Sequence, residues 1–403
     1  MRIALVNNFF LPRASGSAHL TDGLARTMAA RGHSVLVVTA AYDDAAADET
    51  RHGYRVVRLP SWSLPKTKLA MNYDVSFTVS PRNYRRFSRL LDEFAPDVVH
   101  QHGQFFDLTW MSAVWARRRR VPTVLTVHTA LVHTAPAFAA VLWVADMLLP
   151  RTFLAIGRPH VVTIDWFLDS YVRRRYRLSE DRIVPVPIGV DPERFDNVDG
   201  SLVRGQLGLG GRPVVLSIGH VIPLRDRLAL VRAMPYLLEK RPDAVVLVVG
   251  NVYDDRFLHL ADELGVRDSL VVTGGVAREE VPSYVAAADV EGHDFQGYGL
   301  GNASLEVMAA QVPVVSVVRP DNFPGVELRS WENIVIVPPE DPGALADAVV
   351  RLLDDPELAR RVGAGQRKLV VDNFAIDAVT TRHLELYERI AGRGALVSPD
   401  HTR

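Results

Sequence analysis

The chain of 403 residues contains no cysteine, which excludes a disulfide framework, a thiolate metal site and a cysteine nucleophile. The sequence also lacks the pattern of a secretory leader. Its first residues, MRIALVNNFF, carry one arginine and two asparagines within an apolar run, so we expect a first buried strand there. The longest apolar run, residues 135–145, has 11 residues and ends at Asp146, which is too short to span a bilayer. Together these absences favour a cytoplasmic protein.

Net charge is also nearly absent, at −1, but the charges are distributed unevenly. Residues 1–195 hold 25 Lys and Arg against 17 Asp and Glu, whereas the remainder holds 21 against 30. Arginines gather at residues 85–89, 117–120 and 173–175. They are interpreted either as solvated helix faces or as a patch that gives the N-terminal half peripheral membrane contact or binds a phosphate-bearing acceptor. No nucleic-acid-binding module accompanies them, so nucleic acid is not an expected partner.

Apolar strands and amphipathic helices alternate along the chain, and the length favours two domains. Strands rich in Val, Leu and Ile indicate parallel sheets covered on both faces. The sequence therefore predicts an α/β protein with two doubly wound, Rossmann-like domains, in which ligands bind at the carboxyl ends of strands. We place the first domain at residues 1–190 and the second at 191–376. A helix at 377–392 is expected to pack back toward the first domain, and 393–403 form a loose tail.

The most informative stretch is GYGLGNASLEVMAAQVPVV, residues 297–315. Its glycines let a backbone approach a ligand closely. Gly299, Leu300 and Gly301 lead into a helix predicted to begin near Asn302, whose free N–H groups and positive dipole end favour an anion such as a diphosphate. Glu306, one turn inside, can accept two hydrogen bonds from sugar hydroxyls. The alternative interpretation is a tight loop that caps a buried helix.

Several segments in order, RIALVNNFFLPRASGSAH, PDVVHQHG, VLTVHT, VPIGVDPERF, VVLSIGHVIPLRDRLALVRA and the stretch above, carry a family resemblance. The chain resembles the retaining, nucleotide-sugar-dependent glycosyltransferases of the large family 4, which have the GT-B fold. The resemblance implies transfer of a hexose-type sugar from a nucleoside diphosphate to an acceptor, with retention at the anomeric carbon. It implies no cofactor beyond the nucleotide sugar and no obligatory metal, and the sequence has no D-x-D motif.

The resemblance assigns the phosphate clamp of the second domain to Gly219, His220 and Arg225. Such a clamp has a chemical reason, because departure of the diphosphate builds negative charge that fixed positive groups stabilise. Arg225 can grip a phosphate through two parallel hydrogen bonds. His220 stands where the family has arginine, and we expect a bound phosphate to favour its protonated form. The alternative for His220 is a strand-end residue packed against the next loop.

In the first domain the resemblance points to Gly16 and Ser17, whose amides lie before a helix predicted to start near Ala18. Ordinary N-capping by a serine is the alternative and is compatible with that role. His128, at a strand end, is implied to contact the donor sugar and support the reacting centre. His100 and His102 share one face of a strand. They lack a third metal ligand at suitable spacing, so we interpret them as cleft wall on the acceptor side.

One part of the family pattern is missing. Glu306 matches the second of two paired acids, which holds the ribose hydroxyls. The first acid, eight residues upstream, is replaced by Tyr298 if the spacing is strict and by Gln296 if the glycines are aligned; the nearest carboxylate is Asp294. The donor sugar therefore stays open. Gln311 is a milder departure, because glycine usually ends this helix.

The acceptor is open as well, and a lipid-linked, polysaccharide or small-molecule acceptor fits. The apolar segment 135–156 is expected to be a buried helix of the first domain, with insertion into a membrane interface as the alternative. Two rival functions remain, a nucleotide-sugar epimerase of the same fold and a non-catalytic nucleotide-sugar binding protein. A dinucleotide oxidoreductase is excluded, because G-x-G-x-x-G does not follow the first strand.

Overall fold

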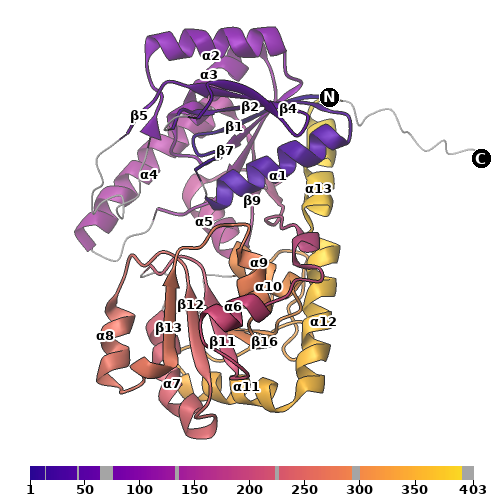
Figure 1. Ribbon diagram of the computed structural model, residues 1–403. Coiled ribbons are helices and arrows are strands. Elements are labelled where there is room, and N and C mark those ends of the chain that lie inside the picture. Colours follow the sequence, from indigo (N-terminus) through magenta and orange to yellow (C-terminus); the bar gives the residue numbers. More distant parts are fainter. Residues whose placement is uncertain are drawn as a thin grey trace, which may run out of the picture. The chain divides into compact units, whose positions relative to one another are not determined.

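The computed structural model describes residues 1–13, 15–42, 45–63, 76–131, 136–222, 227–292 and 300–392 (Figure 1). The chain forms two compact units. Unit 1 comprises Met1–Gly189 together with the residues from Ile376 onward, and unit 2 is Val190–Ala375. The C-terminal helix thus belongs to the same unit as the N-terminal strands.

Unit 1 is built on an eight-stranded sheet in the order β10-β9-β8-β7-β1-β2-β4-β3. All neighbouring strands are parallel except β3 and β4, which are antiparallel. The strands are β1 Arg2–Asn7, β2 Ser34–Ala40, β3 Asp48–Arg51, β4 Tyr54–Leu59, β7 Val98–His102, β8 Thr123–Val127, β9 His160–Thr163 and β10 Ile183–Pro185; β5 Trp62–Ser63 and β6 Ser76–Phe77 pair separately. The helices are α1 Gly16–Ala30, α2 Pro81–Phe94, α3 Asp107–Arg119, α4 Pro136–Gly157, α5 Trp166–Tyr176 and α13 Ile376–Ile390, with the 3₁₀ turn η2 Glu180–Arg182.

Unit 2 has a six-stranded, fully parallel sheet in the order β13-β12-β11-β14-β15-β16. Its strands are β11 Val214–Ile218, β12 Val245–Val249, β13 Leu270–Gly274, β14 Val290–Gly292, β15 Val314–Ser316 and β16 Val335–Ile336. Its helices are α6 Ser201–Gln206, α7 Arg227–Lys240, α8 Arg256–Glu263, α9 Val281–Ala286, α10 Asn302–Ala309, α11 Pro342–Asp354 and α12 Pro356–Asn373, with the 3₁₀ turns η3 Pro192–Phe195 and η5 Arg267–Ser269. The predicted α/β class with two Rossmann-like parallel sheets is confirmed.

The central strands explain why these sheets form. Every residue of β7, β8, β11 and β12 is buried, and long runs of Val, Leu and Ile fit strands whose two faces are both covered. In unit 1 the chain winds outward from β1 in both directions, to β2 on one side and β7 on the other. In unit 2 it does so from β11, to β12 and β14. Ligands of doubly wound sheets bind beyond the carboxyl ends of strands at such switch points.

Helix α13 is fastened to α1, which lies beside it in Figure 1. Arg31, at the end of α1, donates to the hydroxyl of Thr381 at 2.9 Å and to the carbonyl of Asp377 at 2.8 Å. A Cβ on Gly23 would approach the side chain of Ile376 to 2.9 Å, so a glycine on α1 lets the two helices meet closely. The last helix of the chain is therefore an integral part of unit 1.

Helix α4 differs from the sequence expectation. The apolar run of residues 135–145 ends at Asp146, but the helix that contains it continues to Gly157. Residues Ala137–Gly157 are long and apolar enough to cross a membrane by length and composition alone. The expectation of a buried helix is wrong for much of its surface, since only 22% of the apolar window is buried. The exposed apolar side chains are Phe138, Val141, Trp143, Val144, Leu148 and Leu149, whereas Phe153 and Leu154 join the core of unit 1.

Candidate functional site

Helix α10 of unit 2 presents the predicted anion-binding end. Leu300 is buried, and Gly301 is the N-cap, with φ −83° and ψ 176° and no side-chain cap. A helix without a capping side chain leaves its first N–H groups available to a ligand. This end follows β14, which lies next to β11 at the switch point of the sheet. The helix begins at Asn302, as predicted from the sequence.

Glu306 lies one turn inside α10 and is largely buried, at 9% exposure. Its carboxylate is 3.4 Å from Nη2 of Arg278 and 3.7 Å from Nη1 of Arg194. Burial raises the pKa of Glu306, and the two arginines act in the opposite direction. Arg278 follows β13 and Arg194 lies in η3. The sequence analysis did not find either arginine, because only Glu306 lies in a recognisable motif.

The end of β11 is held by close backbone packing. Gly219 has a φ of 117° and donates its N–H to the carbonyl of Val249 at 2.8 Å. The guanidinium of buried Arg227 donates to the carbonyl of Gly219 at 3.2 Å. A Cβ on Gly250 would lie 2.2 Å from that same carbonyl oxygen, so only glycine fits there. The position of Gly219, at the start of the predicted phosphate clamp, is thus fixed by contacts of its backbone.

His220, the next residue after Gly219, is exposed. Its ring lies edge-on to the ring of Tyr253, at a centroid distance of 5.5 Å. Its exposed position leaves room for contact with a ligand, while its contact with Tyr253 agrees with the alternative of a strand-end residue packed against the next loop. The other predicted donor-site residues of unit 2, namely Arg225, Asp294, Gln296, Tyr298 and Gly299, lie outside the described residues.

The first helix of unit 1 begins at Gly16, two residues before the position expected from the sequence. Ser15 is the N-cap, and its hydroxyl accepts from the N–H of Ala18 at 3.1 Å. The N–H groups of Gly16 and Ser17 are the first two of the helix and have no acceptor within it. They follow β1 at the switch point of the sheet, where a phosphate can be held.

Four histidines gather at the carboxyl ends of β7 and β8 and against α13. Nδ1 of His102 lies 2.9 Å from Nε2 of His128. The ring centroids of His100 and His102 are 4.3 Å apart, and those of His100 and His383 are 5.2 Å apart. The hydroxyl of Tyr387 lies 2.5 Å from Nδ1 of His100. We call His100, His102, His128, His383 and Tyr387 the histidine cluster.

The cluster is neutral at neutral pH. Burial lowers the pKa of His128 and of His383 to about 4 in each case. Burial lowers the pKa of His100 and of His102 well below the ordinary value, and neighbouring imidazoles lower both further. Imidazole rings packed together cannot all take up protons away from water. The cluster therefore offers hydrogen bonds and no charge.

The position of His100 and His102 corrects the sequence interpretation. They were expected to line a cleft on the acceptor side, but they are 0% and 1% exposed. Their strand is central in the sheet, and α13 supplies His383 and Tyr387 beside them. An acceptor cannot touch side chains that are buried in this way. Of the three histidines singled out in this region, only His128 is partly exposed.

The sequence signal for the α13 residues was weak. His383 and Tyr387 are four positions apart, so they lie on one face of a helix, but such spacing is common in core-facing helices. In the described ranges, no group of three or more His, Asp or Glu side chains is arranged to hold a metal ion.

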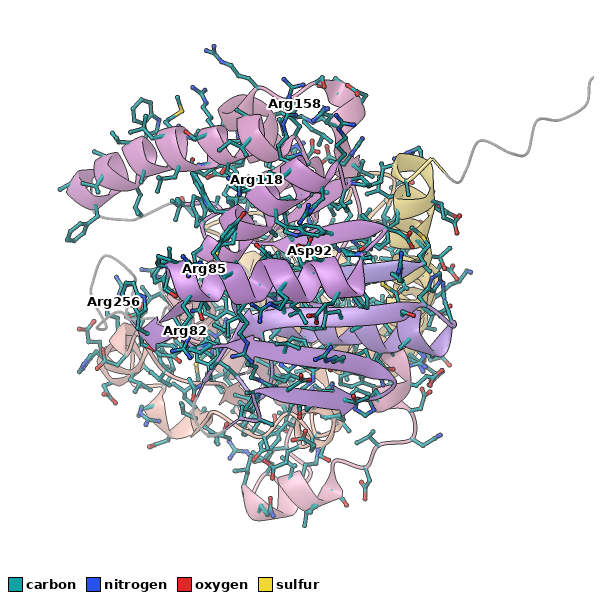
Figure 2. All side chains as sticks on the ribbon, turned by 90° about the horizontal axis from the view of Figure 1, so that it is seen from above. Arg82, Arg85, Asp92, Arg118, Arg158 and Arg256 are labelled. Carbon is teal, nitrogen blue, oxygen red and sulfur yellow. The ribbon has the colours of Figure 1, made fainter. Side chains whose placement is uncertain are left out.

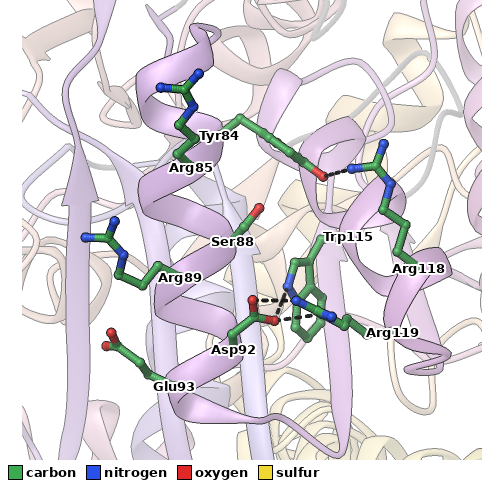
Figure 3. Close-up of a pocket in the computed structure, with 9 residues that line it drawn as sticks. All are labelled: Tyr84, Arg85, Ser88, Arg89, Asp92, Glu93, Trp115, Arg118 and Arg119. Carbon is green, nitrogen blue, oxygen red and sulfur yellow. Dashed lines mark hydrogen bonds and ion pairs between the residues drawn. The ribbon is translucent and has the colours of Figure 1, made fainter.

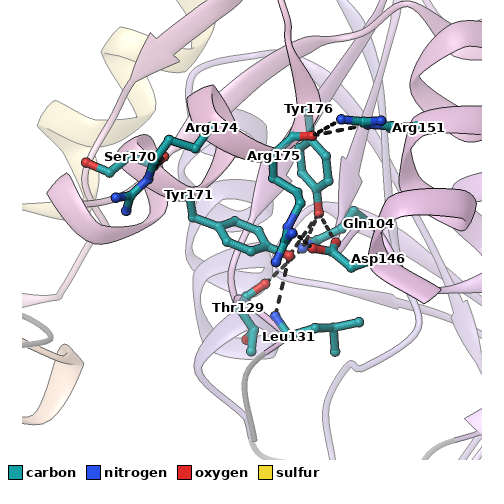
Figure 4. Close-up of polar contacts among 10 residues, drawn as sticks. All are labelled: Gln104, Thr129, Leu131, Asp146, Arg151, Ser170, Tyr171, Arg174, Arg175 and Tyr176. Carbon is teal, nitrogen blue, oxygen red and sulfur yellow. Dashed lines mark hydrogen bonds and ion pairs between the residues drawn. The ribbon is translucent and has the colours of Figure 1, made fainter. Parts of the chain in front are cut away.

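A second polar network anchors α4 beside the strand end that carries His128 (Figure 4). Asp146 of α4 is buried, pairs with Nε of Arg175 at 2.8 Å and accepts from the hydroxyl of Tyr176 at 2.7 Å. The amide of Gln104 donates to Tyr176 at 3.4 Å and to the carbonyl of Thr129, next to His128, at 2.8 Å. The acid that interrupts the apolar sequence is thus a structural anchor of α4.

The same network explains one of the three arginine clusters. Arg175 forms an ion pair with Asp146, and Arg173 forms ion pairs with Asp169 and Glu180. The other two clusters lie on α2 and α3, on which Figure 2 labels Arg85 and Arg118. A surface hollow there is lined by Arg85, Arg89, Arg118 and Arg119 (Figure 3). Within it Arg119 pairs with Asp92 at 2.7 Å, and Arg118 donates to the hydroxyl of Tyr84 at 3.0 Å. Helix α3 packs between α2 and α4, so arginines and the exposed apolar residues of α4 belong to neighbouring helices.

Comparison with known proteins identifies the class. Residues 14–194 match Glycosyltransferase Family 4, and residues 202–369 match Glycosyl transferases group 1. The chain belongs to this family of GT-B glycosyltransferases and is an enzyme that transfers a sugar from a nucleotide sugar.

Curated relatives match almost end to end. The chain is 31% identical to a GDP-mannose-dependent alpha-(1-6)-phosphatidylinositol monomannoside mannosyltransferase of Mycolicibacterium smegmatis, over 96% of this chain and 98% of the relative. It is 30% identical to a D-inositol 3-phosphate glycosyltransferase of Xylanimonas cellulosilytica, over 92% and 90%. Among solved structures, Anabaena Alr3699/HepE in complex with UDP superposes with a TM-score of 0.72 at 15% identity, covering 96% of this chain and all of that one, a likeness of fold.

Proposed function

We propose that this chain is a retaining mannosyltransferase that moves mannose from GDP-mannose to an inositol-containing, lipid-linked acceptor. The observation that carries the proposal is the end-to-end relationship to a GDP-mannose-dependent enzyme that acts on a phosphatidylinositol monomannoside. The arrangement of each unit agrees with it, since the expected donor-site groups that are described lie at the switch points of the two sheets.

The reaction assigns distinct roles to the two units. The bond between the anomeric carbon and the phosphate oxygen breaks, and the acceptor oxygen bonds to that carbon on the same face. The acceptor proton leaves with the diphosphate. Arg225, His220 and the amides at the start of α10 stabilise the departing charge, and Gly16 and Ser17 offer further amides. Glu306 holds the ribose hydroxyls, and His128 contacts the sugar.

We propose that the reaction requires no catalytic metal ion. Arginine and helix N-termini take the place of a divalent cation in neutralising the diphosphate. Turnover is therefore expected to continue after dialysis against a chelator, and a loss of activity that added Mg²⁺ or Mn²⁺ restores would contradict it.

A lipid-linked acceptor also fits the surface of unit 1. Helix α4 exposes Trp143, at 50%, and Leu148, at 63%, and the neighbouring helices α2 and α3 carry arginines that are attracted to anionic lipid. We propose that this surface holds a cytoplasmic enzyme at a membrane as a peripheral protein. The ion pair of buried Asp146 with Arg175 keeps α4 within unit 1, so we expect the helix to lie on the bilayer and not to span it.

Membrane association is tested by flotation with vesicles that contain phosphatidylinositol and with vesicles of neutral lipid alone. We expect binding to the anionic vesicles, weakened severalfold by Leu148→Ser with Leu149→Ser. The matched control is Leu202→Ser, because Leu202 is equally exposed but lies on α6 of unit 2. Equal binding of the two variants would contradict a role for α4.

The function itself is tested with GDP-mannose labelled in the sugar, incubated with and without vesicles that contain phosphatidylinositol and its monomannoside. Transfer of label to lipid supports the proposal, and NMR of the product anomeric proton and carbon reports whether configuration is retained. Label that stays in an isomerised nucleotide sugar would indicate an epimerase. Tight binding without consumption of any nucleotide sugar would indicate the non-catalytic alternative.

A further inference from the structure

The geometry of the histidine cluster carries one step beyond the proposed function, on which it rests. We propose that His102 is a positioning residue for His128, and that it holds the imidazole of His128 in the tautomer protonated on Nδ1. His102 is buried, so it acts on the reaction only through His128.

The contact between the two rings is a directed hydrogen bond. Nδ1 of His102 and Nε2 of His128 are 2.9 Å apart, the ring planes differ by 21°, and the centroids are 5.2 Å apart. That separation is what two nearly coplanar rings give when they meet nitrogen to nitrogen, which is the direction in which an imidazole N–H and lone pair point. The bond fixes the ring orientation of His128 as well as its distance.

Which ring donates follows from the far side of His102. Its Nε2 is buried and has no hydrogen-bond partner in the part of the chain that the structure describes. An N–H there would lack an acceptor, and buried N–H groups without one are rare in native proteins. The single proton of neutral His102 therefore belongs on Nδ1, where it is donated to Nε2 of His128. Nε2 of His128 then accepts, and the proton of His128 is on Nδ1.

The rings behind His102 hold it in place. His383 donates from Nδ1 to the carbonyl of Val379 at 2.9 Å, because a carbonyl can only accept. Its Nε2 is then a lone pair and offers no proton to its neighbours. His100 is held between the hydroxyls of Tyr387, at 2.5 Å from Nδ1, and Thr126, at 2.7 Å from Nε2. Helix α13 thus closes the cluster from behind.

The consequence for the reaction is chemical. In the described part of the chain Nδ1 of His128 has no hydrogen-bond partner, and the residue is partly exposed, so this nitrogen is the one left for a ligand. Protonated, it is a donor toward an oxygen of the sugar, whereas the opposite tautomer would offer a lone pair. A wrong tautomer removes the interaction even when the ring position is unchanged.

The test combines two substitutions at His102 with nitrogen NMR of the full chain labelled with ¹⁵N-histidine. Asn places an amide N–H near the position of Nδ1 and keeps the donor, whereas Leu is similar in size and has none. His128 is assigned from the signals that disappear in His128→Ala. We expect Nδ1 of His128 to be protonated in the parent chain and in His102→Asn, and the two tautomers to be mixed in His102→Leu.

Activity with GDP-mannose gives the second readout. His102→Leu is expected to lower kcat about tenfold, the equivalent of one positioned hydrogen bond, while KM for the donor stays within about twofold. His102→Asn should recover most of the loss, and His160→Asn, on β9 outside the cluster, is the matched control. His102→Leu also removes the hydrogen bond to His128, so a small fall in thermal stability is expected in that variant. The deciding readouts are the tautomer of His128 and a lowered kcat at nearly constant KM, which a purely structural role for His102 would not produce.

Protonation of His128 on Nε2 in the parent chain would overturn the proposal, and so would a His102→Leu variant with unchanged tautomer and kcat. The NMR measurement needs no substrate. If GDP-mannose is not consumed, the proposed function fails while the tautomer assignment is still decided.

Discussion

The two units place contrasting chemistry at equivalent positions of similar sheets. Unit 1 ends its central strands in neutral imidazoles, with buried His102 joined to the partly exposed His128. Unit 2 offers an uncapped helix end and a carboxylate, Glu306, between Arg194 and Arg278. The difference teaches which part of a nucleotide sugar each unit suits, because a charged nucleotide needs charged partners and a neutral sugar needs directed hydrogen bonds.

The sharpest way to break this comparison is His128→Ala. If unit 1 acts on the reacting sugar, kcat should fall by about 100-fold, a typical loss for a positioned imidazole. KM for the nucleotide sugar should change little, since the proposal has His128 contact the sugar and not the nucleotide. The same substitution at His160 should leave kcat unchanged. A variant that loses nucleotide affinity and keeps kcat would reverse the assignment.

Glu306→Gln probes the other side. A hydrogen bond to a charged group contributes about 1.5–3 kcal/mol, so KM for the nucleotide sugar should rise by about 10- to 100-fold. Calorimetric titration with GDP alone should show the same loss, because the ribose belongs to the nucleotide. Glu263→Gln, at the exposed end of α8, is the control. Unchanged GDP affinity would show that Glu306 does not hold the ribose.

Acid should weaken unit 1 through its histidines. His128 and His383 have a folded-state pKa of about 4, below the ordinary 6.5, so the unfolded chain binds more protons between these values. The free energy of unfolding therefore has its full value above pH 6.5 and decreases as the pH falls toward 4. At 1.36 kcal/mol per pKa unit, each contributes on the order of 3 kcal/mol. The raised pKa of Glu306 in unit 2 acts in the opposite sense.

Urea denaturation at pH 7 and pH 5 measures this effect. Five of the six tryptophans lie in unit 1, so fluorescence reports mainly on that unit. The free energy of unfolding should decrease at pH 5, and His383→Leu should reduce the difference between the two pH values. A free energy that does not change with pH would mean that the cluster is open to water.

The smallest effect concerns the end of α10. Gln311 follows this helix with a φ of 63°, a left-handed conformation that costs a residue with a Cβ about 1–2 kcal/mol. Glycine relieves that strain but has a more flexible unfolded state, so Gln311→Gly should stabilise unit 2 by about 0.5–1 kcal/mol. Gln311→Ala keeps the strain and should have little effect. Chemical denaturation followed by circular dichroism compares the two variants, and a destabilising glycine would show that the Gln311 side chain contributes a stabilising contact.

Much of the fold could be predicted from local pattern. The buried runs of β1, β2, β11 and β12 are recognisable as Val- and Leu-rich strands, and the glycines near α10 mark where a backbone approaches a ligand. Other features could not be predicted. The apolar run before Asp146 predicted a buried helix, yet α4 exposes much of its surface. Asp146 instead faces unit 1, where it pairs with Arg175 from another helix, and that pairing cannot be seen in the local sequence.

The sequence by itself determined the two parallel sheets, the order of their strands along the chain and the glycine-marked ends at which a ligand can bind, because apolar periodicity and glycine act over a few residues. Tertiary structure alone decided that His100 and His102 are enclosed and that α13 closes the cluster. The contact between Tyr387 and His100 joins residues 287 positions apart. Such a pairing depends on how α13 packs in unit 1, and the sequence around either residue does not contain that information.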